Sequence, residues 1–160
     1  MKRTLIVVLL LFSVGWQPAH AQSAADNTAI RNIISDQQAA WNKGDGQEYA
    51  RDVATDVSFT NLFGMVFYGK SAFAARHQEI LTSFYKGTRK KHVIRRIKFI
   101  TVDVAIVDID NELSGVKVMP SGIAVPADGI LKTQLMEVLV RRAGIWVVEA
   151  YHNVDVKSRP

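Results

Sequence analysis

Apolar side chains in the first third of the chain recur with the period of an α-helix. Positions i, i+3, i+4, i+7 and i+11 form one stripe, which consists of Ile30, Ile33, Ile34, Gln37 and Trp41. The stripe predicts an amphipathic helix that ends at Gly44. A short second helix is expected to follow, with Asp45 as its N-cap and with Tyr49 and Val53 in its body.

The helical period returns after Gly69. Ser71 suits an N-cap, and the apolar positions that follow it are Phe73, Ala74, Ile80, Leu81 and Phe84. His77 falls on the same stripe. We therefore expect a third helix that directs a histidine toward the core.

Between and after these helices the chain is rich in β-branched and aromatic residues. Residues 57–61 and 65–68 predict two short strands, the second of which ends at a glycine. Residues 92–101 and 104–113 predict two long strands of an antiparallel hairpin.

The turn of this long hairpin is expected at Val102 and Asp103. With that turn, Arg95 would lie opposite Asp110 on the neighbouring strand, where opposite charges attract.

A final hairpin is expected over residues 131–141 and 145–154, with Gly144 as the left-handed residue of a three-residue loop with a bulge. One face of this hairpin would carry Trp146, Val148, Ala150 and His152 beside Val140, Val138, Met136 and Gln134. The opposite face would carry Ile145, Val147 and Tyr151 with Leu139 and Leu135. Because both faces are apolar, we expect one to cover the helices and the other to contact a second subunit.

This register also sets Glu137 opposite Glu149, which is unfavourable for two like charges. A slip of one residue would exchange the two faces of the hairpin. The segment from Ser114 to Gly129, which precedes the hairpin, has no clear period and contains two prolines. Loops of this length are either binding lids or surface excursions, and both interpretations stay open.

The N-terminus has the pattern of a secretory signal peptide. Lys2 and Arg3 precede an apolar run over residues 5–12, and small residues stand at Ala19 and Ala21. The run is much shorter than the roughly 20 residues of a membrane span. We expect export to the bacterial periplasm or the exterior with cleavage after Ala21, which leaves a single domain over residues 22–160 and no membrane contact.

Composition fits an ordinary globular domain, with 48% hydrophobic and 22% charged residues among 160. The chain has no cysteine, which excludes thiol nucleophiles and cysteine-based metal sites. Without the leader, the chain has 18 basic and 15 acidic side chains, and seven of the basic ones fall within residues 86–98. That run lacks the interleaved aromatic residues of a nucleic-acid binder, so we interpret it as a solvated strand face and expect no nucleic-acid partner.

Several short motifs together resemble the SgcJ/EcaC group of the SnoaL-like, ketosteroid isomerase-like proteins, which belong to the nuclear transport factor two superfamily. The matching segments are Trp41-Asn42-Lys43-Gly44-Asp45, Phe59-Thr60-Asn61, Gly64-Met65, Gly69-Lys70 before the helix with His77, and Trp146 leading to His152-Asn153. The resemblance implies an α+β fold in which a cone-shaped, curved antiparallel sheet of about six strands wraps three N-terminal helices and encloses an apolar pocket. It also implies a homodimer through the outer sheet face.

Most catalytic residues of the steroid isomerases are replaced by other residue types at the matching positions of this chain. The position of their tyrosine falls on Gln37, and that of their proton-shuttling aspartate falls on Asn61. Asparagine accepts no proton at neutral pH, so the resemblance does not support the isomerase mechanism here. Their second acid falls near Met136 or Glu137, and the sequence does not choose between the two.

Two histidines, His77 and His152, are predicted to face the pocket. Because histidine titrates near neutrality, they could act as general acid and base, or each could make one buried hydrogen bond without chemistry. The full set of candidate pocket residues is Trp41, Phe59, Asn61, His77, Met136, Trp146 and His152. Asn61 could contact a ligand or close a turn. No metal or cofactor is expected, since the sequence has no dinucleotide, flavin or metal motif.

These observations favour a domain that binds a small hydrophobic molecule. Two other classes stay open: an isomerase, hydratase or lyase that uses His77 or His152 as general acid or base, and a non-catalytic dimeric interaction module. The ligand and any reaction cannot be named from the sequence.

Overall fold

A computed structural model describes residues 24–120 and 123–156, and all structural statements below concern these residues. The expected signal peptide lies outside them. No helix in the described part is long and apolar enough to cross a membrane.

Three helices form, as the apolar stripes predict. α1 (Ala24–Lys43) buries its whole stripe, from Ile30 to Trp41. α2 (Gly46–Tyr49) starts after Asp45, whose side chain accepts a hydrogen bond from the backbone N–H of Glu48. This helix is shorter than expected, because Val53 already belongs to the first strand.

α3 (Lys70–Thr82) buries Phe73, Ala74, His77 and Leu81. Its N-cap is Gly69 and not Ser71, which corrects the prediction. Gly69 has a φ of 87°, a conformation that a residue with a side chain adopts only with strain.

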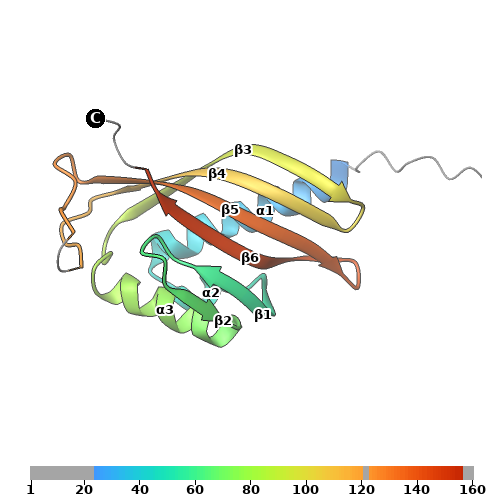
Figure 1. The fold of residues 1–160 in the computed structure, drawn as a ribbon, viewed down its shortest axis with the longest axis horizontal. Helices are drawn as coiled ribbons and strands as arrows, with labels where there is room; N and C mark the ends of the chain where they lie inside the picture. Colours follow the sequence, from blue (N-terminus) through green and yellow to red (C-terminus); the bar gives the residue numbers. More distant parts are fainter. Residues whose placement is uncertain (1–23, 121–122, 157–160) are drawn as a thin grey trace, which may run out of the picture.

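Six strands form one open, mixed sheet in the order β2-β1-β6-β5-β4-β3 (Figure 1). Their bounds are β1 (Val53–Thr60), β2 (Val66–Tyr68), β3 (Arg89–Thr101), β4 (Val104–Ser114), β5 (Ile130–Arg142) and β6 (Ile145–Asp155). The architecture is the expected curved α+β sheet, except that β1 pairs with β6 in parallel. The three helices pack on one side of it, with α1 against β3 and α3 against β1.

The β5–β6 hairpin differs from the expected register. Its turn has two residues, Ala143 and Gly144, both with positive φ, as in the tight turns that match strand twist. Farther along, Val138 pairs with Ala150 while Leu139 pairs with Val148, so Glu149 is an extra residue in β6. This bulge reverses the alternation of β6 beyond it.

The consequence is a mixed inner face. Trp146 and Val148 point inward before the bulge, and Tyr151 points inward after it. Tyr151, and not Glu149, is the partner of Glu137, so the expected repulsion between two glutamates does not occur.

The β3–β4 hairpin forms as predicted, with an irregularity at Arg95. The backbone partner of Asp110 is Val93, yet the side chain of Arg95 reaches Asp110 with Nε 2.5 Å from Oδ2. The connection from β4 to β5 lies at the end of the sheet where β6 ends (Figure 1). Its base is closed by a hydrogen bond from the N–H of Val116 to the carbonyl of Gly129.

Candidate functional site

A small cavity lies between the helices and the inner face of the sheet, and we call it the inner chamber. Its volume is about 40 Å³, which is room for about three waters at roughly 10–15 Å³ each. The residues that line it are Trp41, Phe59, Asn61, Leu62, His77, Ile80, Tyr85, Lys90, Asn111, Leu113, Leu131, Thr133, Tyr151 and Asn153. The exposed lining of the chamber is mainly apolar, as the resemblance implies, but the polar side chains of His77, Lys90 and Asn111 also reach it.

Lys90 is the buried cation of the inner chamber. It lies on β3 with only 4% of its surface exposed. Its Nζ donates a hydrogen bond to the hydroxyl of Tyr49 and lies 3.6 Å from the centre of the Trp41 ring. No carboxylate of the described residues lies within ion-pair distance of it. Burial lowers the pKa of Lys90 to about 7, although Glu137 raises it in part.

A chain of hydroxyl groups continues behind Lys90. The hydroxyls of Tyr49 and Tyr151 lie 3.1 Å apart. The carboxyl group of Glu137 is fully buried, and neither of its oxygens has a hydrogen-bond partner of normal geometry among the described residues. Burial raises the pKa of Glu137 to about 8, while the amide of Gln37 and the charge of Lys90 lower it. Glu137 is therefore largely protonated at neutral pH.

His77 lies on α3 at the wall of the inner chamber. Its Nδ1 is 2.8 Å from the carbonyl oxygen of Phe73, and because a carbonyl only accepts, Nδ1 carries the hydrogen of the neutral ring. Nε2 is then the acceptor. The ring packs 4.5 Å from Tyr49 and 4.2 Å from Phe73, centre to centre. Burial lowers the pKa of His77 to about 3, so this histidine does not titrate near neutrality as the sequence suggested.

Two neighbouring strands supply amide groups to the chamber. Asn111 on β4 is buried, and its Nδ2 donates to the hydroxyl of Thr133 on β5 at 2.8 Å. The other amide atom of Asn111, Oδ1, has no partner among the described residues, and the same holds for Oδ1 of Asn153 on β6. Buried polar atoms without a partner are uncommon and costly. These amides can therefore serve a ligand.

Four of the seven predicted pocket residues line the inner chamber: Trp41, Phe59, Asn61 and His77. The indole N–H of Trp41 is engaged with the hydroxyl of Thr88 at 3.1 Å. Oδ1 of Asn61 accepts from the backbone N–H groups of Phe63 and Met65. Asn61 thus closes the turn between β1 and β2, which is the structural alternative considered for it.

The other three predicted residues do not line the chamber. His152 is exposed on the outer face of β6, and Met136 is 42% exposed beside it on β5. His152 lies beyond the bulge at Glu149, which reverses the alternation of β6. Met136 faces outward for another reason: the two-residue turn pairs Arg141 with Trp146, so the odd-numbered residues of β5 are the ones that face inward. Trp146 is buried, but its Nε1 donates to Asp26 at the start of α1. The resemblance placed the second acid of the steroid isomerases near Met136 or Glu137. Of these two residues, only Glu137 faces inward.

Sequence reasoning missed Lys90, Asn111 and Tyr151 as chamber residues. Alternation along residues 104–113 places Asn111 on the same face as Val107 and Ile109, so its burial could have been inferred. Nothing distinguishes Lys90 from its basic neighbours, and the interpretation of residues 86–98 as wholly solvated is wrong at this position.

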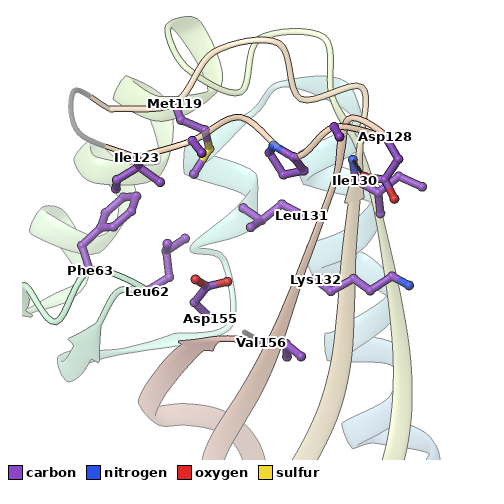
Figure 2. A pocket seen from close by; sticks show the side chains of 13 residues that line it. Leu62, Phe63, Met119, Ile123, Asp128, Ile130, Leu131, Lys132, Asp155 and Val156 are labelled. Atoms are coloured by element: carbon purple, nitrogen blue, oxygen red, sulfur yellow. Dashed lines mark hydrogen bonds between the residues drawn. The ribbon is translucent and has the colours of Figure 1, made fainter. Parts of the chain in front are cut away.

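A larger depression, which we call the outer groove, adjoins the chamber. Figure 2 shows the side chains that line this groove. Its volume is about 960 Å³, and its lining residues are Leu62, Phe63, Met119, Ile123, Ala124, Pro126, Ala127, Asp128, Ile130, Leu131, Lys132, Asp155 and Val156. Leu62 and Leu131 line both spaces. Tyr85 of the chamber also points its hydroxyl at the sulfur of Met119 in the groove, 3.9 Å away.

Among residues 24–120 and 123–156, no group of three or more His, Asp or Glu side chains is placed to hold a metal ion. The side chains described above can transfer protons, donate and accept hydrogen bonds, and form ion pairs.

Comparison with known proteins shows the fold. The chain matches no family model and no curated protein. It is similar to the structure of an uncharacterized protein with a cystatin-like fold from Caulobacter vibrioides, with a TM-score of 0.74, 24% identity, and 82% of this chain and 89% of that chain covered.

It is also similar to a hexachlorocyclohexane dehydrochlorinase (LinA) of type 2, with a TM-score of 0.69, 17% identity, and 83% of this chain and 86% of that chain covered. A ketosteroid isomerase-like protein from Erwinia carotovora atroseptica gives a TM-score of 0.66 at 15% identity, with 85% of this chain and all of that chain covered. At these identities the likeness shows a shared fold and no shared activity. The expected α+β fold, with a curved six-stranded sheet and helices on one side of it, is thereby confirmed.

Proposed function

We propose that this chain is a small-molecule-binding domain of the SnoaL-like kind, whose ligand places a polar group in the inner chamber. The observation that carries this proposal is the buried polar set of Lys90 and Asn111 in the inner chamber, whose wall shares Leu62 and Leu131 with the outer groove. A buried cation without a counter-ion and a buried amide atom without a partner both cost stability. A ligand with polar atoms would offset that cost.

The proposal is tested by what the protein retains when it is purified from the cells that make it. Native mass spectrometry should show a bound small molecule on the wild-type chain. Leu131→Trp would place an indole ring in the wall that the groove and the chamber share, so the bound mass should disappear. Met136→Trp places the same ring on the outer face of the same strand and should leave the bound mass unchanged. Equal retention by both variants would contradict the proposal.

A second candidate function is general acid–base catalysis on a hydrophobic molecule. It is favoured by the fixed tautomer of His77, whose Nε2 is an acceptor at the chamber wall. With a pKa of about 3, His77 would stay unprotonated over the whole working range. The groups that titrate near neutrality are Lys90 and Glu137, with pKa values of about 7 and 8.

This candidate is tested by chloride release from hexachlorocyclohexane and by isomerisation of a β,γ-unsaturated ketosteroid, because similar structures bear those names. If the chain is such an enzyme, its turnover rate should change with pH near pH 7 and pH 8, and His77→Gln should abolish it. His152→Gln should leave it unchanged, since His152 is exposed. Turnover that survives in His77→Gln would exclude the assigned role.

We also propose a homodimer through the outer sheet face. Met136 on β5 and Val154 on β6 lie on this face and are 42% and 57% exposed. Light scattering at micromolar concentration should give twice the chain mass for the wild type and the single mass for Met136→Glu. A monomeric wild type would remove both this proposal and the interaction-module alternative.

Export and membership of the SgcJ/EcaC group are further proposals that rest on the sequence. N-terminal sequencing of the protein from its own host tests the first, with residue 22 expected as the new terminus. Comparison with sequences of that group at 30% identity or more would test the second.

A further inference from the structure

We propose that the ligand is a single-chain amphiphile with a carboxylate head, which is held in the inner chamber by Lys90 and Asn111 while its apolar chain lies in the outer groove. This inference rests on the proposed function and names the chemical class of the ligand. Three features of the site support it: the size of the chamber, the charge inside it and the wall that it shares with the groove.

The size of the chamber limits what can enter. A volume of about 40 Å³ corresponds to about three waters. A carboxylate has three non-hydrogen atoms and is planar, so it fits. A phosphate has five, and a steroid ring system has far more. The part of the ligand in the chamber is therefore a small head group, and the bulk of the molecule must lie elsewhere.

The charge in the chamber favours an anion. Lys90 donates one hydrogen bond, to Tyr49, and has two more N–H donors when protonated. In the structure Nδ2 of Asn111 donates to the hydroxyl of Thr133. A ligand carboxylate would turn this amide over, so that its oxygen accepts from the Thr133 hydroxyl and its Nδ2 donates to the ligand. The titratable groups that face Lys90 from the other elements are Tyr49, His77, Tyr151 and Glu137. None of these repels an anion at neutral pH, because Glu137 is largely protonated and burial raises the pKa of both tyrosines.

The outer groove provides a place for an apolar chain. Leu62 and Leu131 belong to the walls of both the chamber and the groove, so the two spaces are adjacent, and the proposed ligand would run from one to the other along these two side chains. Figure 2 shows Phe63, Met119 and Ile123 facing the same space beyond Leu62. With a volume of about 960 Å³, the groove is more than large enough for a chain of ten to twelve methylene groups.

The experiment compares dodecanoate with dodecan-1-ol, which has the same chain and an uncharged head. Displacement of the neutral dye N-phenyl-1-naphthylamine from the full mature chain reports both affinities. At pH 6.5 dodecanoate should bind the wild type at least tenfold more tightly than the alcohol. Lys90→Met should remove this preference, whereas Lys91→Met, which alters an exposed neighbour on the same strand, should keep it.

Two further variants separate the head from the chain. Asn111→Leu, close in volume, should weaken dodecanoate several-fold without affecting dodecan-1-ol. Ile123→Asp places a charge in the groove and should weaken both ligands. From pH 6.5 to 9 the affinity for dodecanoate should fall about tenfold or more as Lys90 loses its proton, and the affinity for the alcohol should stay constant.

Equal affinity of the acid and the alcohol, or a preference that survives in Lys90→Met, would overturn the inference. The inference can fail in this way while the dye still binds the wild type and does not bind Leu131→Trp. The proposed binding function then stands, with a different class of ligand. If no apolar probe binds and native mass spectrometry finds no ligand, the proposed function fails as well.

Discussion

The side chain of Lys90 donates a hydrogen bond to the hydroxyl oxygen of Tyr49, with Nζ 3.0 Å from the oxygen. The two residues are 41 positions apart in the chain, one on β3 and the other at the end of α2. This buried contact connects α2, the shortest helix, to β3, which is an edge strand of the sheet. It also places an amine where water is scarce, which makes its protonation part of the stability of the protein.

Lys90→Met should therefore stabilise the protein, and by an amount that depends on pH. The folded-state pKa of Lys90 is about 7, below its ordinary 10.5, so the unfolded chain holds the proton more tightly in this interval. Wild-type stability then rises with pH between these values, by at most about 1.4 kcal/mol per unit. The advantage of the variant should be largest below pH 7 and should shrink from pH 8 to 9.5.

Urea unfolding at pH 6, 8 and 9.5 measures this difference. Lys91→Met is the matched control, because Lys91 is the exposed neighbour on β3. A constant difference between Lys90→Met and the wild type at all three pH values would contradict the burial of an ionisable amine.

His77→Gln should make the free energy of unfolding less dependent on pH in the acidic range. The pKa of His77 is lowered from 6.5 to about 3, so on acidification the unfolded state takes up a proton first. Wild-type stability falls as the pH drops from 6.5 toward 3, and His77 accounts for up to about 1.4 kcal/mol per unit of that fall. The variant lacks this contribution.

Denaturant unfolding at pH 7 and pH 5 tests the expectation. His152→Gln, at an exposed position on β6, should follow the wild-type curve. Indistinguishable curves for His77→Gln and His152→Gln would show that His77 is not shielded from water.

Asn61→Ala should lower the free energy of unfolding by about 1–3 kcal/mol. Its Oδ1 accepts two backbone hydrogen bonds, 2.9 Å from the nitrogen of Phe63 and 3.0 Å from that of Met65. Each such bond contributes roughly 0.5–1.5 kcal/mol. Asn61→Asp keeps both acceptor positions and should retain most of the stability in thermal unfolding. If Asn61→Ala lost ligand but no stability, the assigned turn role would be wrong.

Gly46→Ala should disturb the contact between α2 and α3. A Cβ at this position would lie 2.4 Å from the backbone nitrogen of Gln78, which cannot move without displacing α3. Overpacking of this kind costs about 1–3 kcal/mol. Gln47→Ala, at the next and exposed position of α2, should be close to neutral in the same thermal melts. A neutral Gly46→Ala would mean that α2 can shift freely.

Much of the fold was predictable because it depends on local repetition. The stripe from Ile30 to Trp41 has a helical period, and every one of its members is buried. The strands of the two long hairpins were expected close to their observed bounds. In each case many residues of a segment agree, so one irregular position does not change the conclusion.

The inner face of β6 was not predictable in the same way. Alternation would keep His152 on the face of Trp146, but the extra residue Glu149 reverses it and brings Tyr151 inward instead. A bulge depends on the neighbouring strands, here β5 and the parallel strand β1, and no residue type in β6 signals it. For this reason His152 does not face the chamber beside His77 as expected.

The amino-acid sequence by itself determined where helices and strands form and which positions of the helices face the core, since these follow from the spacing of apolar side chains. It also placed Trp41, Phe59 and His77 at the wall of the chamber. Only the tertiary structure decided that Lys90, between two exposed basic residues, is buried against Trp41 and Tyr49. The environment of a charged side chain is set by elements that meet it from distant parts of the chain, and those contacts leave no local pattern.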